Sequence, residues 1–346
     1  MELTTVWFVL IAVLWVGYFV LEGFDFGVGI LGPVLGRDET EKRVLINTIG
    51  PVWDGNEVWV LVAGGATFAA FPEWYATLFS GFYLPLLLIL VALILRGVAF
   101  EYRGKRADRV WRARWDQAVF WGSLVPAVLW GVAFGNIVRG VPIDADKEFV
   151  GDLLGLLNPY ALLGGATTLA LFVTHGAVFL ALKTTGDVRV RANALAGRAG
   201  LVAAVIAVAF LAWTYVLRSD AQLAAGFVVL AALAAAALVG ALVANRAGRE
   251  GWAFVGTAAT IGLAVAALFV SLFPDVMPSS LDPAYSLTTT NAASTEYTLT
   301  IMTWVAVVFT PVVLLYQGWT YWVFRRRIGV ANIPAEPPRA GEPVGR

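Results

Sequence analysis

The chain has 346 residues, of which 59% are hydrophobic and only 14% are charged, and its formal net charge is zero. Soluble domains carry roughly 25% charged residues, so this composition indicates a polytopic membrane protein and not two soluble domains. A net charge of zero gives no support for a nucleic-acid partner. With no cysteine and one histidine, the chain alone cannot build a disulfide, an iron–sulfur cluster, a bis-histidine haem or a multi-histidine metal site.

Long apolar segments predict an all-α polytopic membrane protein with nine transmembrane helices. Each segment has about 20 residues or more, the length that crosses about 30 Å of hydrocarbon. The first segment has no positively charged start and no small-residue cleavage site, so we interpret it as a membrane helix and not as a signal peptide. The predicted spans are residues 4–31, 51–71, 75–100, 116–138, 158–182, 199–217, 221–244, 252–273 and 299–324.

A weak internal repeat predicts how these helices are grouped. The sequence FVLEGFDF at 19–26 resembles FVTHGAVF at 172–179, each near the inner end of the first helix of a four-helix group. The nine helices would then form two four-helix bundles plus one extra helix. We assign residues 1–332 to one transmembrane helical domain and residues 333–346 to a disordered, proline-rich cytoplasmic tail.

The distribution of Lys and Arg predicts the orientation of the chain. Of the 24 basic residues, 20 fall in the odd-numbered loops and the C-terminal tail, and 3 fall in the loops on the opposite side. Loops rich in Lys and Arg stay in the cytoplasm. We therefore expect the N-terminus outside the cell and the C-terminus in the cytoplasm.

Four acids and one arginine mark the predicted functional region, near the inner ends of the first three helices. Glu22 and Asp25 are three residues apart on the first helix, so they share a face. Asp54 and Glu57 begin the second helix, and Arg96 lies on the third. A carboxylate inside a membrane segment costs about 2.5–3.5 kcal/mol on insertion scales, so we expect these acids to have a role.

Two interpretations of this cluster stay open at the level of sequence. In one, Arg96 neutralises an acid in an ion-pair network that fixes the helix register, and Asp54 only favours the start of its helix. In the other, the excess of acids forms a proton inlet from the cytoplasm. Asn56 and Trp53 lie beside the acids and are expected to orient or enclose them.

Three further features carry separate expectations. His175 is open to three interpretations, namely a hydrogen-bonding residue, a proton carrier and a haem ligand. The glycines of GFDFGVG at 23–29, together with Gly64 and Gly65, predict close helix packing. Pro85 is expected to kink its helix.

Five stretches carry a resemblance to a known family, namely GFDFGVG at 23–29, INTIGPVWDGNEVWVLVAGGATFAAFP at 46–72, FSGFYLPLLLILVALILRGVAFEYR at 79–103, GVAFGN at 131–136 and LLNPYALLGG at 156–165. They resemble subunit II of the cytochrome bd-type quinol oxidases. The match covers almost all of the N-terminal half, and the WDGNEVW stretch in its context is highly specific. The rest of the chain agrees mainly in helix count and topology.

The resemblance implies a two-subunit terminal oxidase of the bacterial cell membrane that oxidises a quinol and reduces oxygen to water. In this family subunit I carries two b-type haems, one haem d and the quinol site. Subunit II has nine helices and binds no haem, although some members hold a structural quinone there. The implied partners are the haem-bearing subunit I, small accessory subunits, membrane lipid and quinol, with no nucleic acid among them.

The resemblance also implies roles for individual acids. Subunit II of the family is thought to contribute a hydrophilic proton route from the cytoplasm, and the matching positions here are Asp25 and Asp54. Glu57 falls where the family varies between acid and amide. No catalytic, cofactor-binding or metal-ligating residue is assigned to this chain. The predicted proton pathway is Asp25, Asp54 and Glu57, with Glu22, Asn56, Trp53 and Arg96 as a supporting polar cluster.

Two rival functions would use the same residues. A proton-coupled secondary transporter is the alternative, supported by the acids and by the repeat. Against it, the acids are predicted at the inner edge of the membrane and not at its midplane. A purely structural scaffold subunit is the third hypothesis.

Overall fold

A computed structural model describes residues 2–334 of the chain. The predicted disordered tail therefore lies outside the described residues, apart from residues 333 and 334. The strands β1 (Asp275–Met277) and β2 (Leu287–Thr288) form one small antiparallel sheet. The helices are α1 (Leu3–Leu35), α2 (Glu39–Ile49), α3 (Trp53–Ala70), α4 (Pro72–Gly81), α5 (Tyr83–Tyr102), α6 (Arg109–Arg139), α7 (Pro159–Lys183), α8 (Gly186–Leu217), α9 (Ala224–Arg246), α10 (Glu250–Leu272) and α11 (Glu296–Val323).

Within residues 2–334, eight helices are long and apolar enough to cross a membrane, namely α1 and α5 to α11. This confirms the predicted all-α, polytopic membrane fold. The helix expected over residues 51–71 is present as α3, but it has 18 residues and includes Asp54, Asn56 and Glu57 in its first turns. It is not among the eight apolar spans.

The single helix predicted over residues 75–100 is wrong, because α4 and α5 meet at Phe82. The backbone of Phe82 has φ −103° and ψ 21°, outside helical geometry. Pro85 has no N–H to donate to the carbonyl of Gly81, and its ring would crowd that carbonyl. The expected kink at Pro85 is therefore a boundary between two helices.

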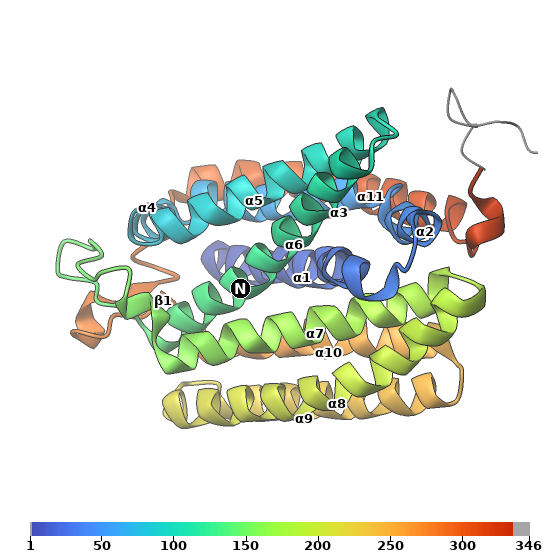
Figure 1. The fold of residues 1–346 in the computed structure, drawn as a ribbon. Coiled ribbons are helices and arrows are strands. Elements are labelled where there is room, and N and C mark those ends of the chain that lie inside the picture. The colour runs from blue at the N-terminus through green and yellow to red at the C-terminus, as the bar shows by residue number, and fades with distance from the viewer. Residues whose placement is uncertain (1, 335–346) are drawn as a thin grey trace, which may run out of the picture.

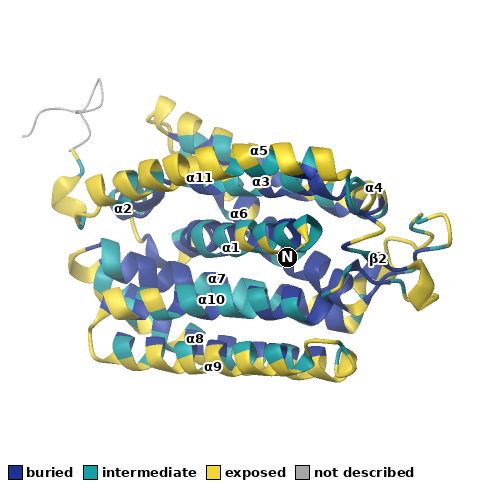
Figure 2. Ribbon diagram, turned by 180° about the vertical axis from the view of Figure 1, so that it is seen from behind, coloured by how far each residue is buried: buried dark blue, intermediate teal, exposed yellow. Residues whose placement is uncertain are grey.

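The helices lie side by side in layers (Figure 1). Helices α3, α5 and α11 form one outer layer, α8 and α9 form the other, and α1, α6, α7 and α10 lie between them. Buried residues concentrate in the central helices, and exposed residues lie on the outer ones (Figure 2). Many exposed side chains are large and apolar, including Leu88, Val205 and Val308, as expected for a surface that faces lipid or a membrane partner.

Glycines bring α1 and α7 into close contact. A Cβ on Gly27 would lie 2.0 Å from the carbonyl oxygen of Phe172 and 2.8 Å from the Cα of Gly176. This confirms the packing role predicted for the first glycine-rich segment. Gly64 and Gly65 make no such contact among residues 2–334, where an added Cβ would meet nothing within 4 Å.

Most of the arginines lie at one end of the helix layers, and we call it the basic end. Two helices start there with a carboxylate that caps the free backbone N–H groups. Asp38 accepts a hydrogen bond from the N–H of Glu41 (2.8 Å) at the start of α2, and Asp108 caps α6 in the same way. The basic end consists of residues 36–50, 103–114, 183–198, 246–250 and 325–328.

The opposite end is covered by two long loops that pair with each other. The N–H of Val141 donates to the carbonyl of Pro278 (3.1 Å), and the N–H of Ser280 donates to the carbonyl of Val141 (2.9 Å). The sheet of β1 and β2 lies in the same cap (Figure 1). The two ends of the helices therefore differ in both charge and structure.

Candidate functional site

Helix α1 places Glu22 and Asp25 on one face and buries both side chains completely. Arg96, also fully buried, reaches across from α5, and its Nη1 donates to Glu22 Oε1. The guanidinium carbon lies 4.8 Å from the ring centre of Phe26 and 5.5 Å from that of Phe100. The expected ion pair is therefore present, and the acid that it neutralises is Glu22.

Asp25 is held by hydrogen bonds that lead away from α1. Asn56 on α3 donates through Nδ2 to Asp25 Oδ2 (2.7 Å). The amide oxygen of Asn56 accepts hydrogen bonds from the hydroxyl of Tyr321 (2.7 Å) and from Nε2 of Gln317 (3.2 Å), both on α11. A continuous chain of hydrogen bonds thus connects the buried carboxylate to the C-terminal helix. The structure thus places Asn56 in direct contact with one of the predicted acids.

Gln317 and Tyr321 are site residues that sequence reasoning missed. They are four residues apart on α11, so they share one face of an otherwise apolar helix. Trp59 on α3 also donates to Gln317 Oε1 (2.9 Å). The sequence feature that could have identified them is this pair of polar side chains, four residues apart in a mainly apolar segment.

A groove of about 890 Å³ separates α11 from α1 and α3. Asn56, Gln317 and Tyr321 line it together with Asp54, and most of its other walls are apolar. Asp54 is exposed in the first turn of α3, where the helix dipole favours its charge, but it is not the N-cap, which is Val52. The structure therefore places Asp54 on the groove and outside the buried cluster.

The two remaining predicted residues on α3 lie at the edge of the cluster. Glu57 is partly buried, and its Oε2 has no hydrogen-bond partner among residues 2–334. The ring of Trp53 packs on that of Phe100, with 5.0 Å between ring centres. Because Phe100 also lies beneath Arg96, Trp53 helps to enclose the ion pair.

The buried cluster has one more carboxyl group than counter-charges, since Arg96 faces both Glu22 and Asp25. Glu22 Oε2, Asp25 Oδ1 and two nitrogens of Arg96 have no partner in the described part of the chain. Burying an uncompensated charge is costly. A carboxyl in excess of its counter-charges can become neutral by binding a proton.

His175 on α7 has both ring nitrogens engaged. Its Nδ1 lies 2.7 Å from the hydroxyl oxygen of Thr257, and its Nε2 lies 3.2 Å from the carbonyl oxygen of Val20. The ring also stacks on Phe254, with 4.7 Å between centres. This geometry fits the hydrogen-bonding interpretation and leaves no imidazole nitrogen of this chain free for a haem iron. Among the described residues, no group of three His, Asp or Glu side chains is placed to hold a metal.

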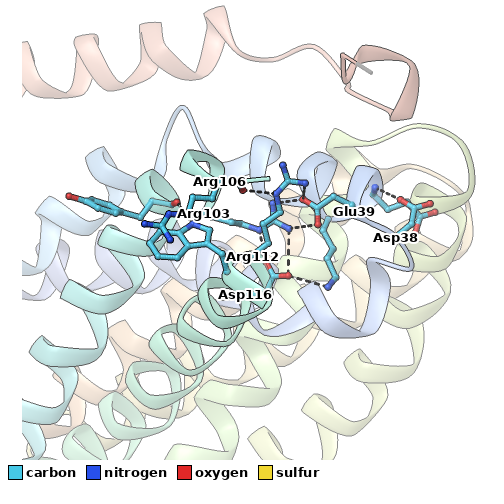
Figure 3. Close-up of polar contacts among 10 residues, drawn as sticks. Asp38, Glu39, Arg103, Arg106, Arg112 and Asp116 are labelled. Atoms are coloured by element: carbon cyan, nitrogen blue, oxygen red, sulfur yellow. Dashed lines mark hydrogen bonds and ion pairs between the residues drawn. The ribbon is translucent and has the colours of Figure 1, made fainter. Parts of the chain in front are cut away.

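A second polar network ties the helix ends together at the basic end (Figure 3). Arg103 donates to both oxygens of Glu39 (2.8 and 3.0 Å) and through Nε to Asp116 (2.5 Å). Lys42 pairs with the same Asp116 at 3.1 Å. These contacts connect α2 and the end of α5 to α6.

Glu41 connects α2 to α8 through Arg191, with 2.7 Å between Glu41 Oε2 and Arg191 Nη2. Burial by itself would raise the pKa of Glu41. The hydrogen bonds from Arg191 and from the N–H of Arg37, with the charge of Arg191, outweigh it and lower this pKa below its ordinary value.

Comparison with known proteins decides the family. Residues 3–324 match the family described as cytochrome bd terminal oxidase subunit II. The chain belongs to this family. It is 46% identical over 329 residues to cytochrome bd ubiquinol oxidase subunit 2 of Bacillus subtilis (strain 168), covering 94% of this chain and 97% of the relative. It is 38% identical over 362 residues to cytochrome bd-I ubiquinol oxidase subunit 2 of Escherichia coli (strain K12), covering 95% and 96%.

The fold agrees with the family. A chain from the structure of bd oxidase from Geobacillus thermodenitrificans is similar with a TM-score of 0.77 at 17% identity, over 94% of this chain and 99% of that chain. The family assignment confirms the predicted resemblance and makes this chain a subunit of a membrane-bound terminal oxidase, an oxidoreductase that contains haem. A subunit II implies a subunit I as its partner. The transporter alternative is not favoured.

Proposed function

We propose that this subunit carries protons from the cytoplasm towards haem groups held by subunit I. The complex would oxidise a quinol and reduce oxygen to water, with two b-type haems, one haem d and the quinol site in subunit I. The names of the relatives, which are ubiquinol oxidases, support a quinol as the electron donor. The observation that carries the proposal is Asp25, a fully buried carboxylate with one unpartnered oxygen among residues 2–334.

We further propose that the basic end is cytoplasmic and that α3 is the ninth transmembrane helix. The excess of Arg and Lys at that end supports the orientation, which places the N-terminus outside. Helix α3 lies in the same layer as α5 and α11, which supports a spanning role (Figure 1). Two four-helix units plus α11 would then make up the nine spans. The polar start of α3 would lie near the cytoplasmic surface.

The proposed route begins at the groove. Asp54 is exposed there and would collect protons from the cytoplasm, with Glu57 close by on α3. Water in the groove and the hydroxyl of Tyr321 would relay them, while Asn56 fixes the orientation of the Asp25 carboxylate. Asp25 would bind and release each proton, and Glu22 with Arg96 would set the local charge. Haem d supplies the oxygen chemistry when it is bound in subunit I.

The layer of α3, α5 and α11 is the surface that we assign to subunit I. Many of the exposed side chains on α5 and α11 are large and apolar, yet the groove within this layer is lined by Asp54, Gln317 and Tyr321. Polar groups at membrane depth need protein or water around them and not lipid. A structural quinone of the kind that some family members hold would also find room in this groove. Small accessory subunits and lipid would cover the remaining apolar surface.

A structural role is the second candidate, and the Glu22–Arg96 pair is the observation that favours it. In that case the acids would hold the helices together for haem assembly and carry no protons. Asp25→Asn and Asp54→Asn, made in the assembled oxidase in proteoliposomes, separate the two candidates. Asp187, exposed at the basic end away from the groove, offers a matched Asp187→Asn control.

The proposal expects full haem content with slower oxygen consumption and slower build-up of membrane potential in both site variants. Wild-type rates in an assembled Asp25→Asn oxidase would contradict the proton role. Loss of haem together with activity would support the structural role instead.

A further inference from the structure

A second cavity approaches the buried cluster from a different side. It has a volume of about 110 Å³ and lies between α1, α2 and α6 near the basic end. Gly29 and Gly32 of α1 form one wall, and Asp116 and Val119 of α6 form another. A Cβ on Gly32 would meet nothing within 4 Å. One water needs about 10–15 Å³ measured in this way, so the cavity has room for several.

The mouth of this cavity is polar and open. A hollow of about 410 Å³ at the basic end shares Lys42, Ala113 and Asp116 with it. Lys42 pairs with Asp116 at the point where the two spaces meet, and Arg103 holds the other oxygen of Asp116 (Figure 3). The Lys42–Asp116 ion pair therefore stands between the cavity and the hollow at the surface.

A buried hydroxyl with no partner lies one helical turn beyond Val119, behind the cavity wall that Gly29 forms. Ser123 on α6 is 0% exposed, and its Oγ has no hydrogen bond to any of residues 2–334. A Cβ on Gly29 would lie 2.1 Å from this oxygen, so the hydroxyl occupies the place that a side chain on Gly29 would fill. Ser123 follows Asp116 by seven residues, which puts both on the face of α6 that lines the cavity.

The buried ion pair begins directly beyond Ser123. A Cβ on its neighbour Gly122 would lie 2.6 Å from the Cβ of Arg96, so α6 packs against α5 at this level. On α1 the spacing from Glu22 through Gly29 to Gly32 follows one face of the helix. Glu22 Oε2 and two nitrogens of Arg96 are unpartnered in the described chain. The cavity itself is lined by the polar side chains of Lys42, Asp116 and Gln117, which favours water inside it, whereas dry cavities are lined by apolar groups alone.

We infer that this cavity is a second proton inlet, which supplies the buried acids along α1 and α6. The inference rests on the proposed proton role of the cluster. A proton from cytoplasmic water passes the Lys42–Asp116 pair and moves along water in the cavity. The hydroxyl of Ser123 accepts it and releases its own proton onward, so that Ser123 is unchanged. Water beyond Ser123 delivers the proton to the free oxygen of Glu22, beside Asp25.

Filling the cavity is the first test. Gly32→Leu places a side chain in the open space, and Gly240→Leu on α9, where an added Cβ also meets nothing within 4 Å, is the matched control. Proton uptake by the assembled oxidase in proteoliposomes should slow several-fold in Gly32→Leu, with haem content and the KM for quinol unchanged. Equal uptake in the two leucine variants would overturn the inlet.

The same assay separates the inlet from the proposed function. If Asp25→Asn slows proton uptake and Gly32→Leu does not, the second inlet is refuted and the proton role of the cluster stands. If neither variant slows uptake, both ideas fail.

Cysteine labelling gives an independent test that does not depend on turnover. The chain has no cysteine, so Ser123→Cys introduces one thiol next to Gly29, behind the inner wall of the cavity. We expect the small hydrophilic reagent 2-aminoethyl methanethiosulfonate, added to the cytoplasmic face, to label it, and Gly32→Leu to block that labelling. Ala127→Cys, equally buried one turn further along α6, should stay unlabelled. An unreactive Ser123→Cys thiol in an assembled oxidase would contradict the inference.

Discussion

Replacing Arg96 by leucine should strongly destabilise the complex. The guanidinium is the counter-charge of Glu22, and both side chains are 0% exposed. Removing one partner of a buried ion pair leaves an uncompensated charge and costs about 3–5 kcal/mol. Here Asp25 lies beside the same guanidinium, so Arg96→Leu leaves two unpaired acids, and we expect the upper part of that range.

The double variant Glu22→Leu/Arg96→Leu provides the comparison that isolates the pair. It removes both charges and replaces them with apolar groups, a change that is often neutral or even stabilising for a buried pair. We expect it to recover at least half of the stability that Arg96→Leu loses. The coupling between neighbouring sites of this kind reaches about 3 kcal/mol.

Thermal inactivation of the purified oxidase, followed by the loss of its haem spectrum, measures these differences. Arg96→Leu should shorten the half-life far more than the double variant does. If the two variants inactivate at the same rate, or if Arg96→Leu matches the wild type, the ion pair contributes nothing and the reasoning is refuted.

Three further predictions concern other parts of the chain. Asn56→Leu removes the donor to the buried carboxylate and should cost about 1–3 kcal/mol in thermal stability, because a buried polar group is left unpaired. The folded-state pKa of Glu41 is below its ordinary value of 4.5. The ionised Glu41 therefore contributes its full stabilisation of the folded protein above pH 4.5, and this contribution is lost as the pH falls through the folded-state pKa. Arg191→Leu removes the partner of Glu41, so the melting temperatures of wild type and this variant should converge as the pH falls below 4.5. A difference in melting temperature that stays constant with pH would contradict this. Gly27→Ala should destabilise by about 1–3 kcal/mol through overpacking, whereas Gly64→Ala should be nearly neutral.

The sequence predicts the helices well because the length of an apolar segment and the caps are local properties. The shared face of Glu22 and Asp25 follows from helical spacing, and the pairing of an acid with Arg96 follows from the cost of a buried charge. The position of Asp54 was harder to predict. Asn56 donates to the buried Asp25, and residues two apart face different sides of a helix. Asp54 therefore lies on the groove but does not reach the buried cluster.

Contacts between distant segments could not be predicted from local pattern. Tyr321 and Gln317 are 265 and 261 residues away from Asn56, to which they donate hydrogen bonds. No periodicity along the chain connects α11 with α3. Likewise, Ser123 has no sequence signal of its own, and its place beside Gly29 is set by how α6 crosses α1. Packing between helices decides these contacts.

The most direct measurement follows proton uptake during a single turnover. Fully reduced oxidase is mixed with oxygen, and the haem spectrum is recorded together with a pH-sensitive dye in the medium. In an assembled Asp25→Asn oxidase, oxygen binding should keep its wild-type rate, while proton uptake and the haem oxidation that depends on it become much slower. Proton uptake at the wild-type rate in that variant would contradict a proton route through this subunit.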